Sequence, residues 1–283
     1  MRILLILSLL IFSLSAKSLF SNSAQADNSI YIGSLKDLVI ATQKTRGLTN
    51  SYMNGNIAAM LLVYANRKDM KKAIGIMESL PLAADPVINS RATTISQSLI
   101  TLNNKAFKME PSEAFASYTE QIGQILMLAQ SVSKRFSKDL HSCGQDASVI
   151  MMETMLPMTE YVGQLRGFGS GLAAKGTISK AELEKIYVLV NEIKTLNSTL
   201  QTQMTQLTSK YQSKLSSKIN SQIATVNTKA TQYTLFAEKN FLNNIKNIDP
   251  NEYFDEGTAL ISAIVEAYNT NNTALLENSK GWL

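Results

Sequence analysis

Apolar side chains recur every three to four residues along most of the chain, which is the spacing of one face of an α-helix. No segment shows the strict alternation of apolar and polar residues that is typical of a β-strand. The pattern therefore predicts an all-α protein. Two segments carry the clearest helical stripes: Leu35, Leu38, Val39, Thr42, Thr49, Met53, Ile57 and Met60 in the first, and Met151, Met155, Met158, Val162, Leu165 and Leu172 in the second.

Turn-forming residues divide the chain into about eight long helices. Between residues 177 and 249 there is neither Gly nor Pro in 73 residues, which predicts one very long helix or two helices joined without such a stop. Short connections make neighbouring helices antiparallel, so eight helices form two up-and-down four-helix bundles or one elongated bundle. The interruptions are Asn54-Gly55, Pro81, Asp85-Pro86, Glu110-Pro111, His141 to Gly144, Gly176 and Asp249-Pro250.

Composition excludes several classes of function. The 283 residues are 45% hydrophobic and 17% charged, which favours a packed core, and they include one Cys and one His. One Cys excludes a disulfide scaffold, and this pair cannot supply the ligands of a zinc site. A Ser/His or Cys/His hydrolase would depend on His141 alone. We therefore expect no enzyme, no metal and no cofactor.

The N-terminus predicts an exported protein. Arg2 precedes an apolar run from Ile3 to Phe12 that continues to Leu14, and Ala24-Gln25-Ala26 fits a signal-peptidase site. We expect a signal peptide at residues 1–26 and a mature helical sensory domain at 27–283, periplasmic or secreted. Cleavage nearer Ala16 and an uncleaved N-terminal anchor remain open. Loss of Arg2 and Lys17 lowers the net charge from +5 to +3, too little to indicate nucleic-acid binding.

Two arginines lie on or beside apolar helix faces. On a helical wheel Arg46 falls inside the stripe of the first helix, and Arg166 falls on the flank of the second stripe. A buried arginine is costly unless an anion or a strong acceptor meets it. Arg46 to Ser51 also resembles Arg166 to Gly171, because each begins with Arg-Gly and a bulky apolar residue before small or polar ones.

This arrangement predicts an anion site between two helices. The guanidinium is planar and always charged, so two such groups suit a small planar oxyanion. The glycines after Arg166 indicate that a neighbouring backbone or a ligand comes close. The candidate ligand-binding residues are Arg46, Arg166, Thr49, Gly167 and Ser170. The structural alternative is that the arginines pair with a carboxylate, such as Glu153 or Glu160.

The same residues carry a family resemblance. The run from Gln43 to Tyr52 resembles the first-helix motif of the nitrate- and nitrite-sensing (NIT) family. Asn66 to Asp69, Met158 to Gly167 with Ala173 to Gly176, and Asn251 to Phe254 with Thr258 and Ile261 are similar to later parts of it. The resemblance implies two four-helix bundles and recognition of nitrate or nitrite by arginines, at positions that match Arg46 and Arg166. The family also has an arginine on a later helix, whereas this sequence has none after Arg166.

Two functions follow as expectations. The first is a stand-alone periplasmic sensor that binds a small inorganic anion, nitrate or nitrite, and signals in trans to a membrane histidine kinase or chemoreceptor. The second is a helical scaffold or interaction protein without a small ligand. A homodimer is left open for both.

Overall fold

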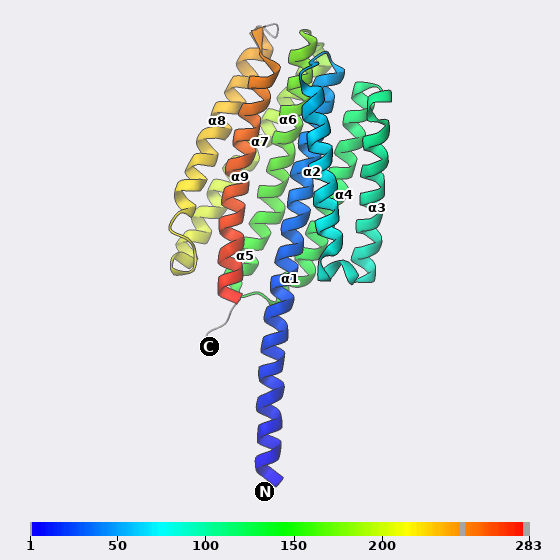
Figure 1. Cartoon of the computed structure of the whole chain (residues 1–283). Helices are drawn as coiled ribbons and strands as arrows, with labels where there is room; N and C mark the ends of the chain where they lie inside the picture. The colour runs from blue at the N-terminus through cyan, green and yellow to red at the C-terminus, as the bar shows by residue number, and fades with distance from the viewer. Residues whose placement is uncertain (1, 244–246, 280–283) are drawn as a thin grey trace.

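The computed structural model of the chain describes residues 2–243 and 247–279, with side chains for 26–138, 140–242 and 247–273. The regular elements formed by these residues are all helices, and none of them is a strand. The predicted all-α class is therefore confirmed (Figure 1). The predicted signal peptide lies almost wholly outside the residues whose side chains are described.

The first bundle contains α1 (Arg2–Met53), α2 (Ala59–Ser79), α3 (Pro86–Lys105) and α4 (Pro111–Phe136). Asp85 begins α3, because its carboxylate accepts hydrogen bonds from the backbone N–H groups of Val87 and Ile88 at 3.0 and 3.2 Å. Proline stands at the first position of both α3 and α4, where a helix needs no N–H donor. Short 3-10 turns follow α2, α3 and α4 at Pro81–Ala84, Ala106–Lys108 and Ser137–Asp139.

The second bundle begins with a helix that contains a wider turn. It runs through α5 (Ser142–Ile150), a π-helical turn (Met151–Met155) and α6 (Leu156–Lys175) without a break. Pro157 has no N–H to donate to the carbonyl oxygen four residues earlier, which favours the π-turn directly before it. Gly176 ends α6 in the left-handed conformation, with φ of 70°.

The long stretch without Gly or Pro holds two helices, α7 (Lys180–Tyr211) and α8 (Ile219–Asn243), joined by a 3-10 turn at Gln212–Lys214. Ser179 and Glu182 form a capping box at the start of α7. The last helix is α9 (Pro250–Ser279). With α5 and α6 counted as one, the described residues form eight helices that alternate in direction.

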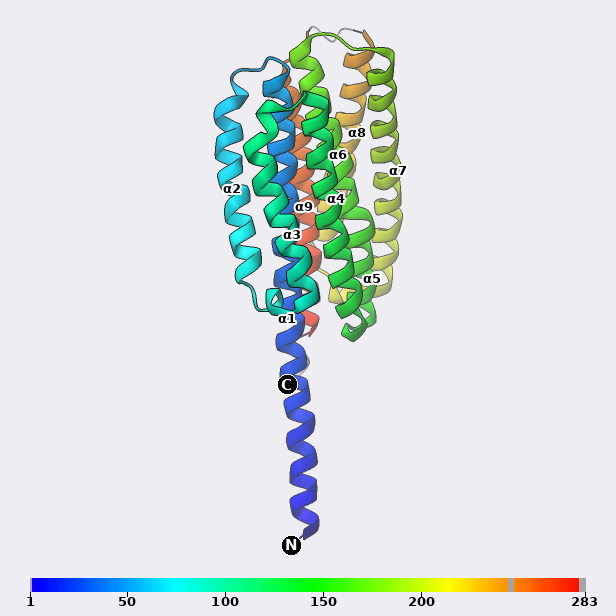
Figure 2. The same cartoon turned by 90° about the vertical axis from the view of Figure 1, so that its right-hand side faces the viewer.

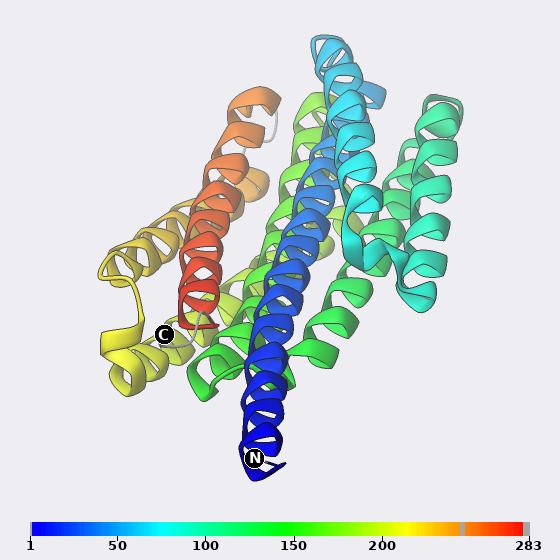
Figure 3. The same ribbon diagram turned by 60° about the horizontal axis from the view of Figure 1, so that its bottom comes forward.

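The two bundles meet along α1 and α6, which run in the same direction (Figures 1 and 3). α1 packs against α2, α4 and α6, and α6 packs against α1, α7 and α9. Helices α2 and α3 lie outside on one side of this centre, and α7 and α8 lie outside on the other (Figure 2). The structure therefore has a central layer of α1, α4, α6 and α9.

The first half of α1 extends beyond the bundles (Figure 1). Within the part of the chain that the structure describes, no helix is both long enough and apolar enough to cross a membrane.

Candidate functional site

The central helices touch at two glycines that directly follow the two arginines. A Cβ atom placed on Gly167 would lie 2.7 Å from the Cα atom of Gly47, and one on Gly47 would lie 3.1 Å from the Cα atom of Gly167. A Cβ atom on Gly169 would lie 2.5 Å from the ring of Tyr253 in α9. The expectation that these glycines allow a close neighbour is confirmed: the neighbours are the α1 backbone and a tyrosine ring.

Arg46 extends from α1 toward α4 and α6 and is fully buried. Its Nη1 atom lies 2.6 Å from Oε1 of Glu160 and donates to Thr119 Oγ1 at 2.8 Å, while its Nη2 atom donates to Oε2 of Glu160 at 3.3 Å. The guanidinium carbon lies 4.9 Å from the centre of the Phe115 ring. Arg46 therefore forms a buried ion pair, which is the carboxylate pairing that the sequence left open.

Arg166 extends from α6 toward α9 and is 1% exposed. Its Nη1 atom donates to Thr258 Oγ1 at 2.9 Å, and its guanidinium carbon lies 4.4 Å from the centre of the Phe254 ring. Its Nε and Nη2 atoms have no hydrogen-bond partner among the described residues. Nor does it form an ion pair with any carboxylate in that part of the chain.

Burial is the largest influence on the charge of Arg166. It lowers the pKa of this guanidinium to about 10, and the positive charge of Arg46 acts in the same direction. Tyr233, Glu160 and Asp255 oppose that shift. Arg166 is therefore still a cation at neutral pH, although it is buried and has no counter-ion among the described residues.

The two arginines sit in equivalent surroundings. Each belongs to an Arg-Gly pair on the first long helix of a bundle, and each contacts a phenylalanine and a threonine, four residues apart, on the last helix. The pattern P-x-E-x-F-x-x-x-T begins α4 at Pro111 and α9 at Pro250 with identical spacing. The two bundles therefore present two copies of one arginine site.

The other predicted site residues, Thr49, Ser170 and Gly167, form no hydrogen bond with either guanidinium group among the described residues. Thr49 faces the first bundle and lies beside Tyr118. Burial raises the pKa of Tyr118, whereas Arg67 and the Thr49 hydroxyl oppose this shift. Ser170 Oγ lies 3.0 Å from Ser51 Oγ and 3.0 Å from the carbonyl oxygen of Pro250, so it links α6 to α1 and to the start of α9.

The carbonyl oxygen of Gly167 accepts a hydrogen bond from Asn50 Nδ2 at 2.9 Å. Of the predicted residues, Gly167 and Ser170 therefore join α6 to α1 directly, and Arg46 and Arg166 extend from these two helices to either side.

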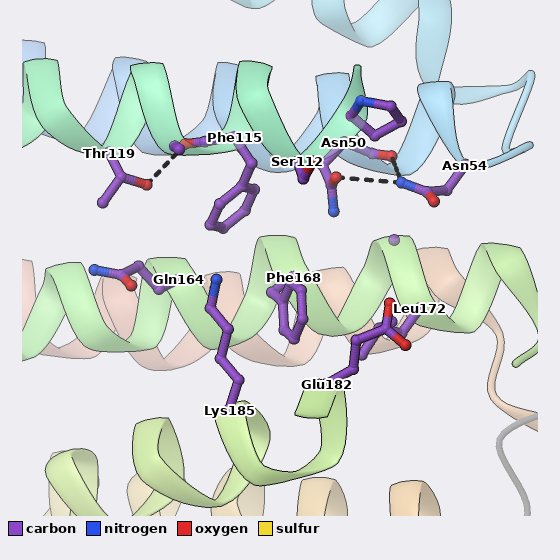
Figure 4. A pocket seen from close by; sticks show the side chains of 13 residues that line it. Asn50, Asn54, Ser112, Phe115, Thr119, Gln164, Phe168, Leu172, Glu182 and Lys185 are labelled. Carbon is purple, nitrogen blue, oxygen red and sulfur yellow. Dashed lines mark hydrogen bonds between the residues drawn. The ribbon is translucent and has the colours of Figure 1, made fainter. Parts of the chain in front are cut away.

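A cleft of about 420 Å³ opens next to Arg46, between α1, α4, α6 and α7 (Figure 4). In this cleft the ammonium group of Lys185 lies between two aromatic rings, 5.2 Å from the centre of the Phe115 ring and 4.4 Å from the centre of the Phe168 ring. Burial and the charge of Arg46 lower the pKa of Lys185. The equivalent ring in the second bundle, Phe254, packs instead in an apolar cluster with Leu48, Ala59 and Val63.

Sequence reasoning missed the aromatic and hydroxyl partners of the arginines as site residues. Phe115, Thr119, Phe254 and Thr258 lie far along the chain from Arg46 and Arg166. The signal that identifies them is the repeated P-x-E-x-F-x-x-x-T pattern, because it occurs once near the start of the last helix of each bundle.

Comparisons with known proteins agree with this architecture. A family described as nitrate and nitrite sensing (NIT) matches residues 37–278. The chain belongs to the NIT family. It is thus a sensing domain and not an enzyme, as expected from its composition. The NIT fold is also that of a solved structure named "Structure of the NasR transcription antiterminator", with a TM-score of 0.64 and 13% identity over 96% of this chain and 74% of that one. No curated protein matches the chain.

Proposed function

We propose that this NIT domain binds a small planar oxyanion, nitrate or nitrite, through Arg166 at the contact between the two bundles. One observation carries the proposal: the guanidinium is buried, charged at neutral pH and without a carboxylate, while Nε and Nη2 lack partners among the described residues. A buried cation gains most from an anion that reaches two of its donors at once. Family membership supports the choice of nitrate or nitrite.

The surroundings of Arg166 suit a flat ion. Phe254 covers the guanidinium from 4.4 Å and Thr258 holds Nη1, which fixes the plane of the group. The Nε and Nη2 atoms, which have no partner among the described residues, lie on one side of the planar group and can donate two nearly parallel hydrogen bonds. Two oxygens of a planar anion match such a pair of donors.

Thermal stability tests the proposal directly. Nitrate that binds only the folded chain stabilises it by RT ln(1 + [L]/Kd), about 2.7 kcal/mol at a hundredfold excess over Kd. We expect nitrate or nitrite to raise the melting temperature relative to chloride at constant ionic strength. Arg166→Gln should abolish the difference, and Arg166→Lys should fail to restore it because the planar fork is lost. The surface variant Arg91→Gln should behave like the wild type.

An equal response to nitrate and chloride up to millimolar concentrations would contradict the proposal. So would a nitrate response that survives in folded Arg166→Gln protein.

We also propose that the domain acts in the periplasm and signals in trans to a membrane histidine kinase or chemoreceptor. The supporting feature is that α9 carries both Phe254 and Thr258, so an anion at Arg166 would favour one position of this helix over another. Nitrate should then change the affinity for the receptor, and the receptor should change the affinity for nitrate by the same factor. Equal recovery of every membrane receptor with and without nitrate would contradict this output.

The scaffold alternative is favoured by one observation, the Arg46–Glu160 ion pair, which gives Arg46 a structural role. It leaves the unpaired Arg166 without explanation. A folded chain that binds no oxyanion would favour the scaffold.

A further inference from the structure

One difference between the two equivalent arginine sites is the carboxylate. Glu160 stands six residues before Arg166 on α6 and reaches across to Arg46. The corresponding residue six positions before Arg46 on α1 is Ile40, a half-buried apolar side chain that packs on the core. The exchange of Glu for Ile is therefore the sequence difference that gives a carboxylate to Arg46 and none to Arg166.

The donors around Glu160 form a complete site for a planar anion. Besides the two contacts from Arg46, Oε2 accepts from Gln43 Nε2 at 3.0 Å and Oε1 accepts from Gln164 Nε2 at 2.9 Å. Each carboxylate oxygen thus receives one guanidinium and one amide hydrogen bond. Two oxygens on a flat, singly charged group are features that a carboxylate shares with nitrate and nitrite.

We propose that the Arg46 site is a second oxyanion site, and that the carboxylate of Glu160 occupies it as a tethered competitor of the free ligand. A group attached to the same fold acts at a high effective concentration, so a dilute free anion does not displace it. The chain then binds one free anion, at Arg166, although it contains two copies of the site. This inference rests on the proposed function for the choice of anion, but it can be tested separately.

The negative charge of Glu160 also acts on Arg166. The pKa of Arg166 responds first to burial, then to Tyr233, and further to Arg46 and Glu160 with opposite signs. Removal of the negative charge of Glu160 therefore makes the electrostatic potential at the contact between the two bundles more positive. Binding of an anion at Arg166 should become tighter, by a factor on the order of ten for like charges within a protein.

The experiment compares the full chain with Glu160→Ala, Glu160→Gln and the control Glu153→Gln. Glu153 lies on the same continuous helix, but its side chain is exposed and makes no ion pair among the described residues. Sodium nitrate is titrated calorimetrically at constant ionic strength. We expect one nitrate per chain for the wild type and the control, and two for Glu160→Ala. Addition of Arg46→Gln to Glu160→Ala should return the number to one.

Chemical rescue provides a second measurement if Glu160→Ala is too unstable to titrate. Formate, the smallest carboxylate, should raise the melting temperature of Glu160→Ala several times more than that of the wild type, and Arg46→Gln should remove this gain. Glu160→Gln keeps the shape of the side chain and one acceptor oxygen, although its amide nitrogen cannot accept the two hydrogen bonds that the other carboxylate oxygen receives. This variant should bind nitrate at Arg166 about tenfold more tightly.

The outcomes separate this inference from the proposed function. One nitrate in the wild type and still one in Glu160→Ala, without rescue by formate, would overturn the second site and leave Arg166 as the ligand site. A second outcome is that the wild type binds no nitrate and Glu160→Ala binds one, which is lost again when Arg46→Gln is added. This result would support the second site, occupied by Glu160 at Arg46, and would contradict binding at Arg166.

Discussion

Gly47 and Gly167 bring the backbones of α1 and α6 into direct contact, and each glycine follows the arginine of its bundle. We expect Gly167→Ala to destabilise the fold, because the new Cβ atom would lie 2.7 Å from the Cα atom of Gly47 and would push the two helices apart. The cost should be about 1–3 kcal/mol, as for other overpacked cores. Chemical denaturation measures it.

The control is Gly123→Ala in α4, where a Cβ atom meets nothing within 4 Å. Alanine favours a helix over glycine by about 1 kcal/mol, so this variant should be more stable than the wild type. A gain of stability in both variants would mean that the helices do not approach as closely as described.

The Arg46–Glu160 pair should show strong coupling in a double-mutant cycle. Arg46→Met leaves a buried carboxylate, and Glu160→Leu leaves a buried guanidinium, so each should cost about 3–5 kcal/mol. The double variant should cost much less than the sum, since no uncompensated charge remains. Additive losses in the free energy of unfolding would show that the two side chains do not form a buried pair in solution.

Alkaline pH should destabilise the protein through its buried tyrosines. Burial raises the pKa of Tyr31 to about 12 and also raises the pKa values of Tyr118, Tyr233, Tyr253 and Tyr268. Above pH 10 the unfolded chain loses these protons while the folded chain keeps them. Stability is therefore lost as the pH rises from 10 toward 12, at about 1.4 kcal/mol per pH unit for each such group.

Two cations oppose that loss. The pKa values of Arg166 and Lys185 are lowered in the folded state, so these groups favour folding as the pH rises. Five tyrosines outweigh them, and the net stability should fall. Denaturant melts with tyrosinate absorbance measure the effect; titration of all ten tyrosines near pH 10 in folded protein would contradict it.

Helical periodicity predicted the burial of Arg46, but it could not predict its partner. Glu153 and Glu160 are seven residues apart and would share one face of a regular helix. The π-turn at Met151–Met155 changes the register between them, so that Glu153 is exposed and Glu160 reaches Arg46. The residue pattern alone does not reveal such a turn.

Helical periodicity also could not predict how deeply Arg166 is buried. On the helical wheel it stands at the edge of the apolar stripe, yet it is 1% exposed because Phe254 and Thr258 of α9 cover it. That packing joins residues far apart in the chain. By contrast, the capping box of Ser179 and Glu182 depends only on neighbouring residues and can be identified in the sequence.

The position of the anion is the central claim, and a crystal structure of the full chain grown in sodium nitrate tests it most directly, with sodium chloride as the matched control. We predict a flat ion within hydrogen-bond distance of Nε and Nη2 of Arg166, while Glu160 keeps its contact with Arg46. Nitrate found only elsewhere, for example beside Lys185 in the cleft, or no ordered nitrate in protein that binds it in solution, would contradict the account.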